Sequence, residues 1–184
     1  MNLYTADLHL GHENVIRFDG RPFRNAEEMD EFLIEKWNGK VKDEDVVYVA
    51  GDFCFRSGRN PVEYLKRLKG RKRLVIGNHD GSLLKNRPAM SYFESADDLL
   101  RISDGGTQVV LCHYPLAEWP GYFRGVVHVY GHIHNNVRND AWKYMGRQNG
   151  ALNAGCMIND WEPVSLDELR ANNEKFAREA GFRI

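Results

Sequence analysis

The chain has 184 residues, of which 42% are hydrophobic, and a formal net charge of −1. The composition excludes a disordered chain, and the length fits a single domain, which we expect to span residues 1–184. The balanced charge excludes the strong basic field that gathers long nucleic acids or anionic membranes.

The longest apolar run, Val46–Ala50, is far shorter than the roughly 20 residues of a membrane-spanning helix. The first residues contain no basic segment followed by an apolar core, so we expect no secretory signal. The three cysteines are widely spaced and form no C-x-x-C motif, which favours a reducing compartment. We therefore expect a cytoplasmic protein with no membrane partner, and we predict no particular oligomeric state.

Strands and helices alternate in the first half of the chain. Three nearly continuous apolar runs are typical of strands covered on both faces: Leu3–Ala6, Val46–Ala50 and Arg73–Ile76. Helices are predicted to begin after the capping residues Asn25, Asn60 and Ser165, each followed three positions later by Glu. The first two are expected to end at Gly39 and Gly70. This order favours a largely parallel sheet with crossover helices.

The second half is richer in strands. The segments Leu99–Ser103 and Thr107–Cys112 flank Asp104-Gly105-Gly106, a pattern typical of a β-hairpin. Two further strands are predicted at Val126–Tyr130 and Ala151–Cys156. Both halves fit an α/β fold in which two sheets pack together with helices outside.

Residues that can bind metals follow five of the predicted strands. They are Asp7-Leu8-His9, Gly51-Asp52, Gly77-Asn78-His79-Asp80, His113 and Gly131-His132-Ile133-His134. Because ligands bind beyond the carboxyl ends of strands in α/β sheets, these motifs predict one shared site. Carboxylate, imidazole and amide groups suit Mn, Fe, Zn, Ni or Co without selecting among them.

The spacing within these motifs has a physical reason. In extended chain, residues i and i+2 face the same way, so Asp7 and His9 could hold one ion together, as could His132 and His134. A glycine, which allows a sharp turn and a close backbone approach, precedes Asp52, Asn78 and His132. Each motif alone has a structural explanation: Asp7 and His9 could be a surface pair or Asp7 a capping residue, and residues 77–80 could be a turn in which Asp80 caps a short helix through residues 82–84. Five such motifs at strand ends together favour a metal site.

The order of these motifs resembles that of the calcineurin-like metallophosphoesterase superfamily: D-x-H, GD, GNH[DE], a lone histidine and GHxH. Further stretches resemble a small single-domain bacterial and phage-type branch of that superfamily, namely residues 7–12, Arg21-Pro22-Phe23 and Pro163-Val164-Ser165. The resemblance implies a four-layer α/β/β/α sandwich, in which helices flank two mixed β-sheets, and a centre with two divalent metal ions.

The resemblance also implies a role for each motif residue. One metal would be held by Asp7, His9, Asp52 and His134. The other would be held by Asp52, Asn78, His113 and His132, with Asp52 bridging the two ions. His79 would not be a ligand but would lie beside the phosphate and help the leaving oxygen depart as a general acid.

The expected activity is hydrolysis of a small phosphomonoester or phosphodiester, such as a nucleotide, by a hydroxide that bridges the two metals. We expect His12 and Arg56 to contact the substrate at the mouth of the site, whereas Arg21 and Arg24 are weaker candidates. A carboxylate that orients His79 would favour its role, and Asp80 is the nearest in sequence.

Two alternative functions stay open. The first is a nuclease that cuts short DNA or RNA ends; the balanced charge counts against long polymers. The second is a non-catalytic scaffold that keeps the fold, although every ligand position of the motif set is filled here.

Overall fold

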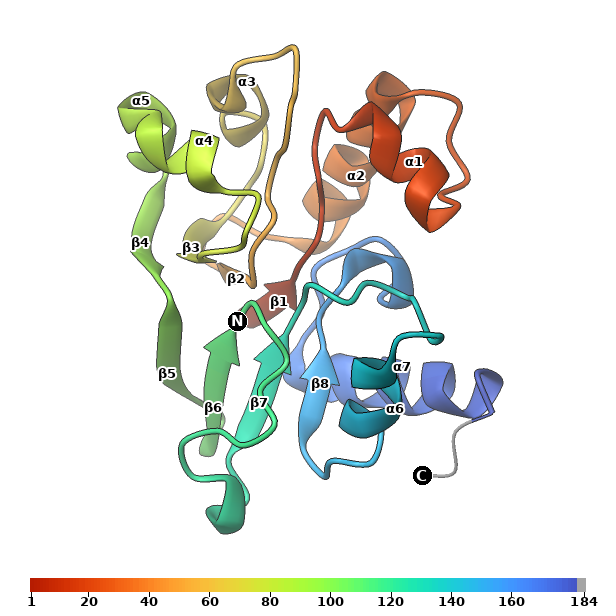
Figure 1. The fold of residues 1–184 in the computed structure, drawn as a ribbon. Coiled ribbons are helices and arrows are strands. Elements are labelled where there is room, and N and C mark those ends of the chain that lie inside the picture. Colours follow the sequence, from red (N-terminus) through yellow and green to blue (C-terminus); the bar gives the residue numbers. More distant parts are fainter. Residues whose placement is uncertain (182–184) are drawn as a thin grey trace.

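Two four-stranded β-sheets pack against each other in the computed structural model, which describes residues 1–181 (Figure 1). The first sheet has the order β1 (Asn2–Thr5), β2 (Val46–Val49), β3 (Arg71–Val75) and β4 (Phe93–Asp97). The second has the order β5 (Leu99–Asp104), β6 (Thr107–Cys112), β7 (Val127–Tyr130) and β8 (Ala151–Asn153). Only Asp98 separates β4 from β5, so the chain passes directly from one sheet into the other.

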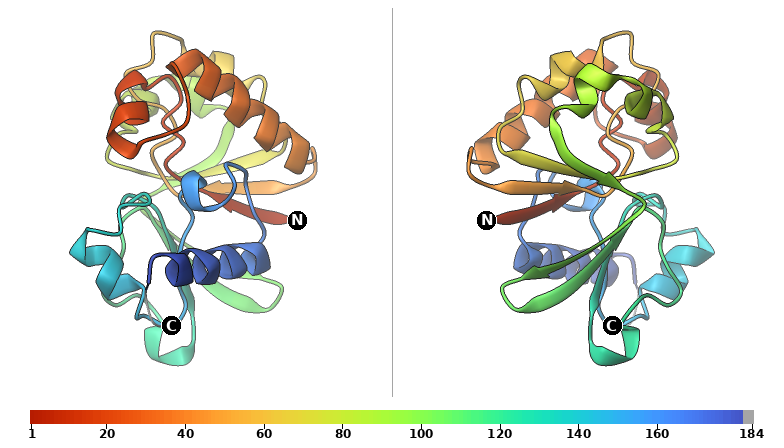
Figure 2. Two further views of the ribbon diagram at one scale, coloured as in Figure 1. Left: turned by 90° about the vertical axis from the view of Figure 1, so that its right-hand side faces the viewer. Right: turned by 90° about the vertical axis from the view of Figure 1, so that its left-hand side faces the viewer.

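The strands of the first sheet pair in parallel because helices connect each strand to the next. These helices are α1 (Glu13–Asp19), α2 (Ala26–Lys40), α3 (Pro61–Leu65), α4 (Gly81–Lys85) and α5 (Arg87–Met90). All five lie on the outer side of this sheet, at the top of both views in Figure 2. Side chains alternate along β1: Leu3 packs into the core beneath the helices, whereas Tyr4 packs between the sheets against Tyr48.

The second sheet is mixed. The β5–β6 hairpin turns through Gly105 and Gly106, both with left-handed φ, and β6, β7 and β8 pair in parallel. Its outer face is covered by α6 (Asp140–Met145) and the 3₁₀ helix η1 (Tyr122–Arg124), while α7 (Leu166–Glu179) contacts β8 and β1. A second 3₁₀ helix, η2 (Cys156–Ile158), precedes α7. The predicted α/β/β/α sandwich is confirmed, and the second sheet is mixed as expected. The four strands of the first sheet pair only in parallel, and an isolated antiparallel bridge joins Tyr4 to Val164.

Local differences from the predicted elements have simple causes. Helix α2 runs past Gly39 to Lys40, and α3 ends at Leu65 rather than at Gly70, whose left-handed φ instead forms the turn before β3. Strand β4 was not predicted, because Phe93 is its one buried residue and no alternation of apolar and polar residues marks it. The capping side chains act as predicted, although Glu28 accepts from Arg24 rather than completing a capping box with Asn25.

No helix within residues 1–181 combines the length and the apolar character needed to cross a membrane.

Glycines bring the strand-end loops into direct contact. A Cβ atom on Gly77 would lie 2.3 Å from Oδ1 of Asp52, and one on Gly51 would lie 2.2 Å from Nδ1 of His113. A Cβ on Gly131 would lie 2.8 Å from the Cβ of Ala6. The predicted need for close backbone approach at these glycines is therefore confirmed.

We predict that Gly77→Ala destabilises the fold by about 1–3 kcal/mol, because the added methyl group meets the backbone and carboxylate of Asp52. Urea unfolding monitored by circular dichroism measures the change. Gly39→Ala is the matched control: it lies within α2 with nothing within 4 Å, so the substitution should be neutral or stabilise by up to about 1 kcal/mol. Equal stability of the two variants would contradict the prediction.

Candidate metal and catalytic centre

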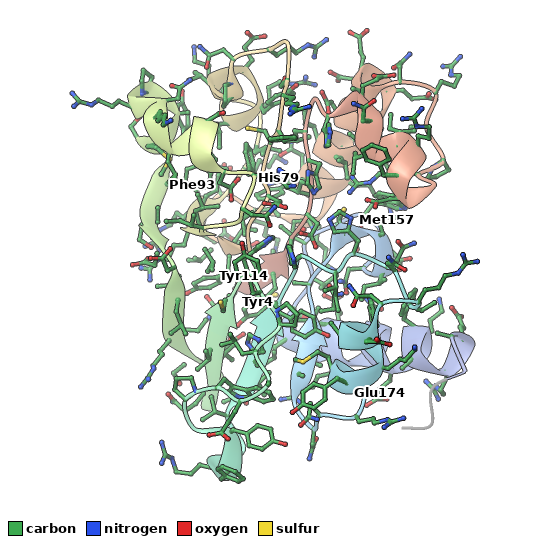
Figure 3. All side chains as sticks on the ribbon, in the orientation of Figure 1. Tyr4, His79, Phe93, Tyr114, Met157 and Glu174 are labelled. Atoms are coloured by element: carbon green, nitrogen blue, oxygen red, sulfur yellow. The ribbon has the colours of Figure 1, made fainter. Side chains whose placement is uncertain are left out.

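The five sequence motifs lie in loops at the carboxyl ends of β1, β2, β3, β6 and β7, where the two sheets meet. Figure 3 labels His79 and Tyr114, which lie near this junction. Side chains from distant parts of the sequence are thereby brought together, as the position of the motifs predicted.

The first group of side chains is compact. One ligand atom from each of Asp7, His9, Asp52 and His134 lies within 4.8 Å of all the others. Nε2 of His9 is 3.2 Å from Nε2 of His134 and 3.5 Å from Oδ2 of Asp52. Oδ2 of Asp7 is buried and has no hydrogen-bond partner among residues 1–181. An unpartnered buried carboxylate oxygen and two facing imidazole nitrogens fit a divalent cation between them.

The second group adjoins the first. Oδ1 of Asn78 lies 2.9 Å from Nε2 of His113 and 2.9 Å from Nδ1 of His132. Nδ1 of His113 lies 2.8 Å from the carbonyl oxygen of Ala50. Since a carbonyl only accepts, Nδ1 donates and Nε2 of the neutral ring presents a lone pair. Two acceptors, Nε2 and the Asn78 oxygen, then face each other, an arrangement that a cation between them would satisfy.

Asp52 lies between the two groups. Its Oδ2 is 3.5 Å from Nε2 of His9 and 3.6 Å from Nε2 of His113. His134 lies with the first group and His132 with the second, so the i, i+2 pair does not face a single ion, contrary to the argument from extended chain. The structure thus brings all seven predicted ligands into two neighbouring groups.

The backbone at these ligands is not extended. Positive φ values between 47° and 71° occur at Asp7, His9, Asp52, His132 and His134. Asp7 and His9 therefore converge through a left-handed turn and not through the two-residue period of a strand. Non-glycine residues in this region cost about 1–3 kcal/mol each and concentrate at functional sites.

Burial is the largest cause of the pKa shifts of Asp7 and His9, whereas the hydrogen bond of Asp19 and the charge of Asp7 raise the pKa of His134 against the effect of burial. Burial raises the pKa of Asp7, although the charges of His134 and His113 oppose the shift. Burial, together with the neighbouring positive charges of His134 and Arg21, lowers the pKa of His9. Both shifts favour neutral side chains in the absence of a cation, and neutral imidazole is the form that binds a metal.

His79 and His12 form one wall of the site with Phe55. The ring of His79 lies 5.3 Å from that of His9 and 4.1 Å from that of Phe55, and its backbone N–H donates to Oδ1 of Asp52. His12 is 8% exposed, and its ring lies 5.5 Å from His9 and 4.9 Å from Phe55. Burial and the charge of His79 lower the pKa of His12, so its imidazole is neutral at pH 7.

Arg56 is exposed and adopts a left-handed φ of 48°. Its guanidinium lies 5.1 Å from the Phe55 ring, and its charge also lowers the pKa of His12. The structure therefore places both predicted substrate contacts beside Phe55, which the sequence analysis did not single out. Phe55 follows Asp52 by three positions and belongs to none of the motifs, so the sequence did not indicate its position at the site.

Asp80 neither caps helix α4 nor orients the ring of His79, the two roles considered from the sequence. Its carboxylate accepts hydrogen bonds from the backbone N–H groups of Gly77, Asp52 and Phe53 at 2.8–2.9 Å. It makes no side-chain capping bond to α4 and no hydrogen bond to the ring of His79 within the described chain. Burial raises the pKa of Asp80 to about 6. Asp80 thus ties the loop after β2 to the loop after β3.

Tyr114 lies at the edge of the site, whereas His128 is buried within strand β7. Tyr114 is 45% exposed, and its ring lies 4.7 Å from that of His132 at the edge of the site. His128 is fully buried, and its ring nitrogens lie 3.2 Å from the carbonyl of Val110 and 3.1 Å from the N–H of Leu116. His128 is therefore a structural histidine with both ring nitrogens paired.

One carboxylate at the site was missed altogether. Both side-chain oxygens of Asp19 lie 2.8 Å from Nδ1 of His134. The two residues are 115 positions apart, and Asp19 ends a helix without belonging to any motif, so the sequence offered no signal.

We predict that Asp80→Ala destabilises the protein by about 3 kcal/mol or more, because each of three buried donors left unpaired costs about 1–3 kcal/mol. Chemical denaturation is the measurement. The exposed Asp140, which pairs with Lys143 on the surface, supplies the control Asp140→Ala, expected to change stability by less than about 1 kcal/mol. Wild-type stability of Asp80→Ala would rule out its role in joining the loops.

Comparisons with known proteins agree with this geometry. The family model described as calcineurin-like phosphoesterase matches residues 3–148. The uncharacterized protein MJ1445 of Methanocaldococcus jannaschii is 30% identical over 164 residues, 88% of this chain and 85% of that protein. The gene 66 protein of Mycobacterium phage D29 is 30% identical over 159 residues, 73% of this chain and 78% of that protein.

A solved structure is similar over nearly the whole chain. The protein of unknown function AQ665 from Aquifex aeolicus aligns with a TM-score of 0.73 and 28% identity, covering 93% of this chain and 98% of that one. The family model covers all five motifs, and the predicted resemblance is confirmed. The chain belongs to the calcineurin-like phosphoesterase family.

Proposed function

We propose that this protein is a dinuclear metal-dependent phosphoesterase that hydrolyses a small phosphomonoester or phosphodiester, with nucleotides among its candidate substrates. Family membership supports phosphoester hydrolysis. The observation that carries the proposal is the convergence of four ligand atoms within 4.8 Å, with the ring of His79 beside them.

Each of the two groups of side chains would hold one metal ion. Asp7, His9, Asp52 and His134 would hold one divalent ion, and Asp52, Asn78, His113 and His132 the other. The position of Asp52 Oδ2, about equally far from His9 and His113, supports its bridging role. When bound, such ions activate water and offset charge on a phosphoryl group. The donor set suits Mn, Fe, Zn, Ni or Co, and Mn²⁺ is the first metal to test.

The surrounding residues act on the phosphate and the leaving group. The ring of His79 makes no hydrogen bond among residues 1–181, so its nitrogens are available to the leaving oxygen. Contact with Phe55 limits the orientations of that ring. The neutral imidazole of His12 can donate one hydrogen bond to the substrate, and Arg56 supplies a positive charge on the same wall.

We predict that His79→Ala keeps its metals but loses about 10²–10⁴-fold in kcat, since a positioned general acid contributes about that factor. Asp52→Ala should instead lose bound metal, because Asp52 contacts ligands of both groups. Elemental analysis of the purified variants and steady-state kinetics separate the two effects. A metal-replete His79→Ala protein with full activity would remove His79 from the mechanism.

We further predict that chelator-treated protein is inactive and that added Mn²⁺, Ni²⁺ or Zn²⁺ restores hydrolysis of chromogenic phosphomonoesters or phosphodiesters. The same assay with a short single-stranded oligonucleotide tests the nuclease alternative. Release of nucleotides from the oligonucleotide with no turnover of the small esters would replace the small-substrate proposal. Metal-loaded protein that cleaves none of these substrates would contradict phosphoesterase activity.

A further inference from the structure

The segment that follows α1 reaches two separate loops of the metal centre. Helix α1 ends at Asp19, and Gly20 takes a left-handed φ of 64°, which turns the chain back on itself. Arg21 then points inward with its side chain fully buried, while Asp19 faces His134.

All five N–H donors of Arg21 are engaged. Nη1 donates to the carbonyl of Leu8 at 2.9 Å and to Sδ of Met29, and Nη2 donates to the carbonyl of Asp7 at 2.9 Å. Nε and Nη2 also donate to Oδ2 of Asp19, at 3.2 Å and 3.1 Å. Since a guanidinium has five donors in a fixed plane, none is left for a phosphate. Arg21 is therefore not the substrate contact that the sequence had suggested as a weaker candidate.

The contact of Asp19 with His134 sets the state of that imidazole. Both carboxylate oxygens of Asp19 lie 2.8 Å from Nδ1 of His134, and Nε and Nη2 of Arg21 donate to Oδ2 of Asp19. A carboxylate oxygen paired with a guanidinium accepts, so Nδ1 of His134 donates to Asp19, and Nε2 of His134 turns toward Nε2 of His9, 3.2 Å away. A carboxylate at the outer nitrogen of a metal-binding histidine fixes both tautomer and ring orientation.

Arg21 stabilises the loop that carries Asp7 and His9, two other residues of the group to which His134 belongs. Asp7 and His9 have φ values of 56° and 53°, and the two carbonyls that Arg21 binds, of Asp7 and Leu8, belong to the peptides between them. Arg21 thereby stabilises the left-handed turn that presents both side chains. Its charge is balanced by Asp19, whose side chain is 12% exposed and which links the turn to His134.

We propose that Asp19 and Arg21 are positioning residues of the metal centre: Asp19 fixes the tautomer of His134, and Arg21 fixes Asp19 and the Asp7–His9 turn. The proposal rests on the proposed metal dependence but not on the identity of the substrate. The same two side chains thus couple the helical layer outside the first sheet to a ligand that follows β7 of the second sheet.

The test compares Asp19→Asn and Arg21→Lys with wild type by titrating metal-free protein with Mn²⁺ in a calorimeter. We expect Asp19→Asn to weaken Mn²⁺ binding by about 10–100-fold, the usual effect of removing an outer partner of a ligand. Arg21→Lys should also weaken binding, because an ammonium cannot span the carbonyls and the carboxylate together. Arg71 is an exposed arginine that pairs with Glu94 on the surface, so the control variant Arg71→Ala should bind Mn²⁺ like wild type.

A second measurement keeps the proposal testable if Arg21→Lys folds poorly. In metal-free protein, ¹⁵N spectra of the imidazoles should show His134 protonated at Nδ1, and this preference should disappear in Asp19→Ala. Wild-type Mn²⁺ affinity in Asp19→Asn, or an unchanged His134 tautomer in Asp19→Ala, would overturn the proposal. Normal Mn²⁺ binding without hydrolysis of any phosphoester would instead contradict the proposed function and leave the positioning role intact.

Discussion

The carboxylate of Asp52 is the point at which the loops of the two sheets meet. Its Oδ2 lies within 3.6 Å of His9, from the loop after β1, and of His113, which directly follows β6. Its Oδ1 accepts the backbone N–H of His79, and its own N–H donates to Asp80. Any change in the distance between the sheets therefore displaces Asp52 relative to side chains on both sides. The glycines at the strand ends are required because only a backbone without Cβ permits this approach.

Buried charge explains why these loops suit a cation. Burial raises the pKa of both Asp7 and Asp80, so a positive charge beside either carboxylate would favour its ionised form. The nearby buried cation, Arg21, contacts the backbone carbonyl of Asp7 and the carboxylate of Asp19, not the carboxylate of Asp7. Oδ2 of Asp7 has no hydrogen-bond partner among residues 1–181, which fits a carboxylate that would bind a cation. The net charge of −1 for the whole chain reveals nothing of this local imbalance.

Features set by local sequence could be predicted well. Strands β1, β2 and β7, the β5–β6 hairpin and the helix caps follow from apolar runs, turn glycines and capping residues within a few positions. The motif residues converge because they directly follow such strands. Edge strand β4 escaped prediction because its burial comes from neighbouring elements and not from its own pattern.

Features set by tertiary contact could not be predicted in the same way. Asp19 and Arg21 act on groups up to 115 positions away, and nothing in their own segment marks the partner. Asp80 was expected to cap a helix or orient His79, because those are its neighbours in sequence; instead it binds amides of two loops. Phe55 lies at the site because its ring packs against the rings of His12 and His79, two contacts that its own sequence segment does not indicate.

Backbone conformation distinguishes the residues whose structure follows from local sequence from those that tertiary contacts hold in place. Eight non-glycine residues have positive φ in the described chain, and six of them are predicted ligands or substrate contacts, including Asp7, Asp52 and Arg56. Local preference opposes this conformation, so tertiary contacts must hold it, as Arg21 does at the turn after β1. Asp7 and His9 lie together in one group of ligand atoms, as predicted, but they do so through left-handed backbone and not through the two-residue period of a strand. Departure from local preference therefore coincides with six of the predicted site residues, although Asn78, His79 and His113 lack a positive φ.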